Sequence, residues 1–240
     1  MIGIVVVLAF PLITLLAFTA LFFIYQTRGR WLSKFQRHTF FWYPLMLAAA
    51  FGVIASTASG RTGLINVAGT LAANGSVSLW AAVAIVIGGA LFVLEKVVAT
   101  ALDRAGPHLP ALVGAALDGR TSEMAEIGLS AWAWTLYAIG FVLGEEWLWR
   151  GFLLMQLPAR FGWSAALALV VSSVAFGSNH YIFGARNVLL KSIEGFVWGA
   201  LFLASGTILV PILSHFAFAL LVGRDLRRRD LNVQPSYTRS

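Results

Sequence analysis

The sequence predicts an all-α fold, a polytopic transmembrane helical bundle with about seven spans. Of the 240 residues, 59% are hydrophobic and 11% are charged, whereas soluble domains average roughly 45–50% and about 25%. The mean hydropathy is +0.83, and a soluble core of this size cannot bury so much apolar surface. Apolar runs close to the length that crosses a bilayer lie at about 2–25, 39–57, 79–100, 130–156, 163–183, 189–204 and 207–223.

The spacing of these runs predicts one domain. Spans of about 20 residues joined by short polar connectors use the whole chain, so residues 1–240 are expected to form a single membrane domain. The first run, from Met1 to about Tyr25, is longer than a signal-peptide core and has no basic region before it. We therefore expect it to be a retained span. The polar stretch between Leu102 and Glu123 is expected to lie at the membrane interface.

The uneven distribution of Lys and Arg predicts the orientation in the membrane, because cytoplasmic connectors carry an excess of these residues. One set of alternate connectors holds only Arg61 and Arg160. The other set, with the C-terminal tail, holds Arg28, Arg30, Lys34, Arg37, Arg104, Arg120, Arg186, Lys191, Arg224, Arg227, Arg228, Arg229 and Arg239. With an odd number of spans, the N-terminus is expected outside a cell (plasma) membrane and the basic tail 224–240 in the cytoplasm.

The net charge of +7 does not indicate nucleic-acid binding. The basic residues cluster at the ends of apolar runs and not on one face with interleaved aromatic residues, so the expected partner is the lipid bilayer. The chain has no cysteine, which excludes thiolate nucleophiles and thiolate metal ligands. Catalytic or metal-binding chemistry would therefore use His, Asp and Glu.

The fourth apolar run contains three charged residues in the segment from Gly144 to Gly151. Left unpaired in a bilayer, these charges would cost roughly 8–10 kcal/mol together, so each needs a partner. Glu146 and Arg150 are four residues apart on one helix face, where an acid before a base forms a favourable pair. Glu145 points about 100° away and has no such partner, so it is the carboxylate expected to face a polar cavity. The alternative is a structural ion pair with Glu145 as a spectator.

Two histidines lie in later apolar runs, His180 in the fifth and His215 in the seventh. One intramembrane histidine is often only a helix contact, but two of them beside a buried pair of glutamates indicate a site. His38 and His108 lie in connectors and are expected to be solvated. Glu194 is expected to form an interfacial pair with Lys191, three residues before it.

These segments resemble the CPBP family of intramembrane peptidases, the CaaX-protease and bacteriocin-processing group also called Abi. The family signatures are Glu-Glu-x-x-x-Arg on one helix, Phe-x-x-x-His on the next, and a His followed four positions later by Asn or Asp. Glu145, Glu146 and Arg150 match the first, Phe176 and His180 match the second, and His215 matches part of the third. The resemblance covers a motif-bearing core of about 130–222.

The resemblance implies a role for each matched residue. Glu145 would activate a water that His180 also holds, Glu146 and Arg150 would lock the helix face, and His215 would donate to the oxyanion. Glu145, His180 and His215 are also a ligand set for a catalytic zinc. The sequence does not distinguish zinc from a metal-free mechanism, and it indicates no other cofactor.

Position 219 departs from the family signature, because Ala219 stands where the family has Asn or Asp. Loss of one oxyanion donor lowers a rate by about 10²–10³-fold, so this departure predicts a slow or inactive enzyme. Two functions are favoured from the sequence over a third, a transporter or proton pathway, which would need broken helices or repeated halves. One is an endopeptidase that cleaves a membrane-associated peptide or protein. The other is an inactive family member that serves as an immunity protein, a scaffold or an accessory subunit of a membrane protein complex.

Overall fold

The computed structural model describes residues 1–26, 31–57, 60–63, 77–105, 130–181 and 184–233, and these residues form helices and short turns without any strand. The long elements are α1 (Ile2–Gln26), α2 (Trp31–Ser56), α4 (Val77–Ala105), α6 (Ala131–Glu146), η4 (Trp147–Leu154), α7 (Met155–Phe161), α8 (Ala165–Ser178), α9 (Ala185–Ser205) and α10 (Leu209–Val233). The predicted all-α class is confirmed.

Each predicted apolar run corresponds to one helical segment, and α6, η4 and α7 together form the continuous fourth segment. Several boundaries differ from the prediction, the most at α10, which ends at Val233 and not near residue 223. Helix α2 begins at Trp31 and not near residue 39, because hydropathy marks the part of a helix that lies in lipid and misses a polar first turn. Helix α8 ends at Ser178 and not near residue 183. His180 therefore follows the helix instead of lying within it.

Three of the described helices have the length and composition of membrane spans. Segments Leu79–Ala105, Ala185–Ser205 and Leu209–Arg228 are long and apolar enough to cross a bilayer, and Ile2–Thr14, Tyr43–Ser56 and Ala165–Ser178 are shorter apolar helices. Large apolar side chains are exposed along one side of α4, at Leu79, Ile85, Val86, Val93 and Val97. Exposed apolar surface of this extent faces lipid, and the chain is an integral membrane protein.

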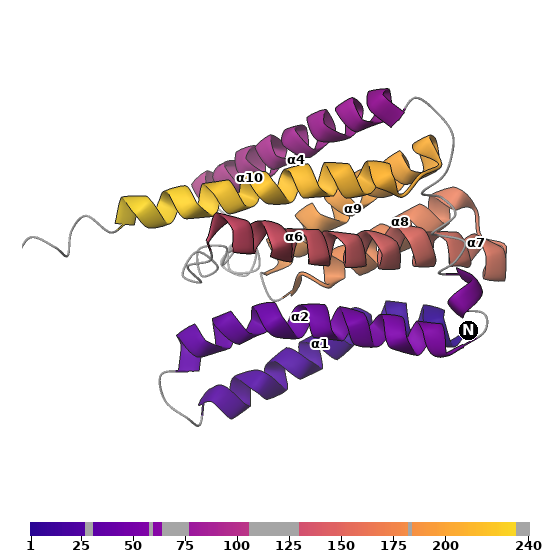
Figure 1. Ribbon diagram of the computed structural model, residues 1–240, viewed down its shortest axis with the longest axis horizontal. Helices are drawn as coiled ribbons and strands as arrows, with labels where there is room; N and C mark the ends of the chain where they lie inside the picture. The colour runs from indigo at the N-terminus through magenta and orange to yellow at the C-terminus, as the bar shows by residue number, and fades with distance from the viewer. Residues whose placement is uncertain (27–30, 58–59, 64–76, 106–129, 182–183, 234–240) are drawn as a thin grey trace, which may run out of the picture.

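The helices pack in layers (Figure 1). The α1–α2 hairpin forms one layer below α6, and α9, α10 and α4 lie on the other side of α6 and α8. Because the chain runs back and forth, the ends of α1, α4 and α10 lie where α2, α6 and α9 begin, at the left of Figure 1. These are the helix ends to which the basic connectors and the basic tail attach.

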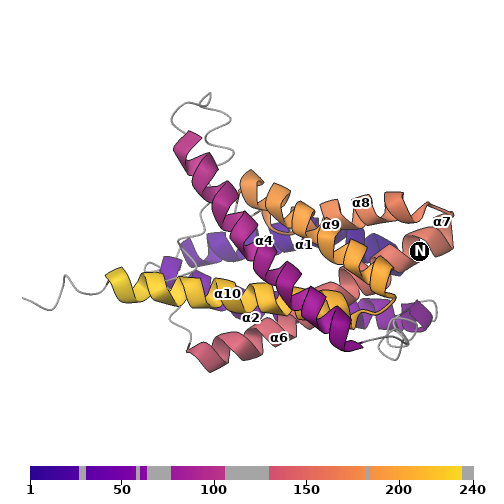
Figure 2. The same cartoon turned by 90° about the horizontal axis from the view of Figure 1, so that it is seen from above.

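Helix α4 crosses α9 and α10 obliquely (Figure 2) and forms ion pairs with both. Lys191 on α9 lies 2.8 Å from Glu95 on α4 and 2.9 Å from Glu194 on its own helix. The predicted pair of Lys191 with Glu194 is thereby confirmed. Two further ion pairs join Lys96 on α4 to Asp225 on α10, and Arg186 on α9 to Asp103 on α4.

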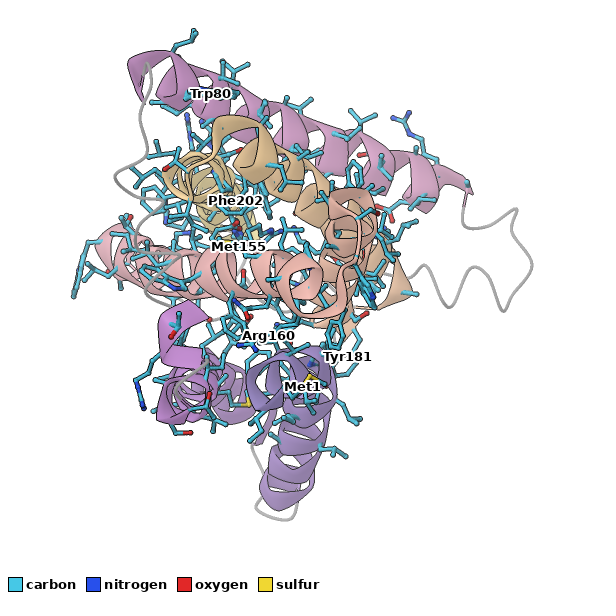
Figure 3. All side chains as sticks on the ribbon, turned by 90° about the vertical axis from the view of Figure 1, so that its right-hand side faces the viewer. Met1, Trp80, Met155, Arg160, Tyr181 and Phe202 are labelled. Atoms are coloured by element: carbon cyan, nitrogen blue, oxygen red, sulfur yellow. The ribbon has the colours of Figure 1, made fainter. Side chains whose placement is uncertain are left out.

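One large apolar cluster fills the space between the layers and includes Phe10, Trp149, Phe176, Trp198 and Phe218. Figure 3 views the bundle from the end at which Met1 lies, with Trp80 on the far layer and Phe202 and Met155 between them. His38 lies within α2 and not in the connector that the sequence predicted. Several other predictions concern side chains that the structure does not describe: the solvation of His38 and His108, most of the interfacial stretch, and the basic residues Arg28, Arg30, Lys34, Arg37, Arg120, Arg229 and Arg239.

Candidate active site

The helix that carries the paired glutamates changes its winding at the site. Ser130 caps the start of α6 by accepting from the Ala133 backbone N–H, and the helix continues after Glu146 as the π-helical segment η4. Such π segments are rare and occur frequently at functional sites. Glu145 and Glu146 lie in the last turn of α6 and Arg150 lies in η4, and all three are buried.

Glu146 lies at the centre of a buried ionic group. Its Oε1 accepts from Arg150 Nη1 at 2.9 Å and contacts His215 Nδ1 at 2.7 Å. The first contact is the pair predicted from the four-residue spacing. The guanidinium of Arg150 also lies over the ring of Phe176, with 4.2 Å between Cζ and the ring centroid. This cation–π contact adds to the ion pair in an environment that excludes water.

The His215 ring is fixed from several sides. It stacks on Trp198 with ring centroids 3.9 Å apart and an interplanar angle of 18°, and Trp198 in turn donates from Nε1 to Ser214 Oγ at 3.2 Å. Because the Glu146 carboxylate is an acceptor, the proton of the neutral imidazole lies on Nδ1. The lone pair on Nε2 then faces Glu145 Oε2 at 3.8 Å. This distance is too long for a direct hydrogen bond.

Glu145 is held by residues from α1, α2 and the end of α8. Its Oε1 accepts a short hydrogen bond from the hydroxyl of Tyr43 on α2. Asn179 Nδ2 donates to that hydroxyl at 2.7 Å, and Thr14 Oγ1 lies 3.1 Å from Asn179 Oδ1 and 2.9 Å from the Pro11 carbonyl. The carboxylate that lacks a partner on its own helix is therefore bound from the facing layer.

His180 lies just after the end of α8 and packs against Phe176. Its Nδ1 lies 3.2 Å from the Phe176 carbonyl one turn before it. The Phe176 ring packs edge-to-face against both imidazoles, with centroids 5.0 Å from His180 and 6.1 Å from His215. Over the part of the chain that is described, no three His, Asp or Glu side chains form a group that could hold a metal ion. The side chains as placed do not assemble the zinc ligand set.

Ala219 lies one turn after His215 in apolar surroundings. It is buried in a small cluster with Ala138 and Val142 of α6, and its carbonyl accepts from Trp134 Nε1 at 3.0 Å. The position that carries an amide or acid in the family signature thus contributes only a methyl group to helix packing here.

A comparison against protein families matches the segment of the chain that carries this site. Residues 127–221 match the family of type II CAAX prenyl endopeptidases described as Rce1-like. This match confirms the family resemblance. The matched segment contains Glu145, Glu146, Arg150, His180 and His215, and its limits agree with the motif-bearing core predicted at about 130–222. No curated protein and no solved structure matches the chain.

Two residues that contact the site through hydrogen bonds lie outside the Rce1-like segment, and the sequence analysis did not find them. Tyr43 and Thr14 belong to spans without a motif, and a hydroxyl in an apolar run is a weak signal. Asn179 lies inside the segment, next to His180, at a position where regular helical geometry would turn it about 100° away from the histidine. The end of α8 at Ser178 removes that constraint.

Proposed function

We propose that the protein is an intramembrane endopeptidase that hydrolyses a peptide bond near or within the membrane with a water activated by Glu145. The observation that carries this proposal is the pairing of Glu145 with His215 inside the helix bundle, where Glu145 Oε2 faces His215 Nε2 at 3.8 Å. A single water can hydrogen-bond to both atoms across this distance. The match to a family of CAAX endopeptidases supports the same reaction class.

The reaction balances with these residues alone. The Glu145 carboxylate takes a proton from the water, and the water oxygen bonds to the carbonyl carbon of the peptide while the π electrons of that carbonyl move to its oxygen. When the tetrahedral species collapses, the C–N bond breaks and the leaving nitrogen takes up the proton. The products are a carboxylic acid and an amine.

Glu146 and Arg150 prepare His215 for proton transfer in this scheme. The Glu146 carboxylate accepts from Nδ1 and leaves the Nε2 lone pair directed toward the water. His215 Nε2 then takes the proton of the water from Glu145 and passes it to the leaving nitrogen, in place of the oxyanion donor that the family resemblance implies. Arg150 balances the charge of Glu146, which would otherwise be buried without a cation.

The site is proposed to act in the cell membrane, with the N-terminus outside and the C-terminus in the cytoplasm. The substrate class follows from the family description, which is that of prenyl endopeptidases for CAAX sequences. In such sequences a C-terminal Cys carries a prenyl chain that inserts into the bilayer. An active site that opens within the membrane suits a substrate anchored in this way.

The test uses the purified full-length protein in liposomes and two fluorescent reporters, a prenylated CAAX peptide and an unmodified transmembrane peptide. We expect cleavage of at least one reporter and a loss of about 10²–10⁴-fold in kcat for Glu145→Gln. The matched control is Glu194→Gln, a change of the same kind at a buried glutamate outside the site. Absence of cleavage by the unaltered protein would support the non-catalytic alternative.

Adding a zinc chelator to the same assay tests whether the reaction requires zinc. The described side chains do not group around a metal position, so we expect the rate to survive incubation with a strong zinc chelator. A loss of activity that added zinc restores would show instead that Glu145, His180 and His215 come together around a metal in the active state.

A further inference from the structure

The proposed reaction needs a hydrogen-bond donor for the oxyanion, and the two residues named by the family signature do not provide one here. Ala219 has no polar side chain, and its neighbours on α6 are Ala138 and Val142. The proton of the neutral His215 ring lies on Nδ1, which is committed to Glu146. Oxyanion donors contribute strongly to acyl transfer, so another group must supply this contact if the protein is active.

Tyr43 has the position and the orientation of such a donor. Its hydroxyl contacts Glu145 Oε1, and its ring is held edge-on against Phe10 with centroids 6.3 Å apart. Because the Asn179 amide donates to the phenolic oxygen, the single proton of Tyr43 is directed toward the carboxylate. The donor is therefore ordered before any substrate arrives.

During the reaction, the preferred acceptor of the Tyr43 hydroxyl changes from Glu145 to the substrate oxygen. The base, the attacked carbonyl carbon and the developing oxyanion lie within a few ångströms of one another in any productive complex. As Glu145 takes the proton of the water it loses its negative charge and becomes a weaker acceptor for Tyr43. The substrate oxygen gains that charge at the same moment. A donor shared in this way stabilises the transition state more than the ground state, which is the condition for catalysis.

We propose that Tyr43 is a catalytic residue, whose hydroxyl donates to the oxyanion in place of the amide or acid that the family signature has at position 219. The inference rests on the proposed peptidase function and extends it to a residue outside the Rce1-like segment. It assigns Asn179 as the positioning residue that orients the Tyr43 hydroxyl, with Thr14 behind it.

The test compares Tyr43→Phe with the unaltered full-length protein in the liposome assay. We expect kcat to fall by about 10²–10³-fold with KM changed by less than about threefold, because the lost contact forms mainly in the transition state. The matched control is Tyr181→Phe, since the Tyr181 hydroxyl is buried without a hydrogen-bond partner among the described residues. We expect this control to keep the original kcat.

A rescue experiment separates a donor from a merely structural tyrosine. Adding Ala219→Asn to the Tyr43→Phe protein restores the family donor one turn from His215. We expect kcat of this double variant to be at least about tenfold higher than that of Tyr43→Phe. Asn179→Leu keeps Tyr43 but frees its hydroxyl, and we expect an intermediate loss in kcat. Elution as a monodisperse peak from a sizing column checks that each variant is folded.

The outcomes distinguish the two proposals. Cleavage that requires Glu145 but is unchanged in Tyr43→Phe overturns the role of Tyr43 alone. A fall in kcat that Ala219→Asn does not rescue, together with no loss in Asn179→Leu, overturns it as well. If the unaltered protein cleaves neither reporter, the proposed function fails first and the role of Tyr43 fails with it.

Discussion

His215 Nδ1 lies 2.7 Å from Glu146 Oε1 across the interface between α6 and α10. The same carboxylate oxygen accepts from Arg150 at 2.9 Å, so a cation, an acid and an imidazole from two helices meet at one buried atom. In a bilayer this arrangement both holds the two helices together and fixes the imidazole tautomer.

Arg150→Met should destabilise the protein by about 3–5 kcal/mol, because it leaves the Glu146 carboxylate buried without a cation. The double change Glu146→Gln with Arg150→Met removes both charges and should recover a large part of that loss. Thermal unfolding of the detergent-solubilised protein measures both effects. Equal destabilisation of the single and double variants would mean that the lost packing on Phe176, and not the unpaired charge, sets the stability.

Lys191→Met should also be strongly destabilising, by about 3–5 kcal/mol, because Glu95 and Glu194 then face each other without their shared cation. Lys96→Met is the matched control. Its side chain is 37% exposed in its pair with Asp225, and exposed pairs contribute only about 0–1 kcal/mol. The same unfolding measurement compares the two variants, and similar melting temperatures would argue against an energetic role for the buried cluster.

Ala219→Asn in the otherwise unaltered protein should change kcat by less than about threefold, because Tyr43 already supplies the oxyanion donor. It should also lower stability by about 1–3 kcal/mol, since the amide is buried against Ala138 and Val142. Steady-state kinetics and thermal unfolding measure the two effects. A rise in kcat of about 10²–10³-fold would show that the site lacks a donor, and the assignment of Tyr43 would then be wrong.

The C-terminus should lie in the cytoplasm. A reporter enzyme that folds only in the cytoplasm should therefore be active when it is fused after Ser240. The reason is the concentration of Lys and Arg at one set of connectors, which attach to the helix ends at the left of Figure 1. A second fusion near Thr62, between α2 and α4, should report the opposite side. Activity of the C-terminal fusion outside the cell would reverse the orientation.

The sequence predicted the all-α class, the succession of spans and the pairing of Glu146 with Arg150, because these depend on local properties. Apolar length identifies a span wherever it occurs, and a spacing of four residues places two side chains on one helix face. The resemblance to CaaX proteases could likewise be recognised, because its motifs are short and lie within single helices.

The remaining features of the site depend on contacts between distant helices, which a single sequence does not reveal. Glu145 receives its hydrogen bond from Tyr43, 102 positions earlier in the chain, and no local pattern joins the two. The place of His180 depends on the end of α8 at Ser178, and apolar composition continues past that point. The prediction of a slow or inactive enzyme rests on the residue at 219 alone, and the proposed donor Tyr43 lies in another layer of the bundle.

Hydrolysis in water enriched in oxygen-18 tests the central claim most directly. Under single-turnover conditions with the purified protein in liposomes, mass spectrometry of the N-terminal product and of the protein locates the heavy oxygen. A water activated by Glu145 predicts one heavy oxygen in the new carboxyl group of the product and none in the Glu145 side chain, and Glu145→Gln should form labelled product about 10²–10⁴-fold more slowly. Label in the Glu145 carboxyl group, or product formation by Glu145→Gln at the original rate, would contradict the account.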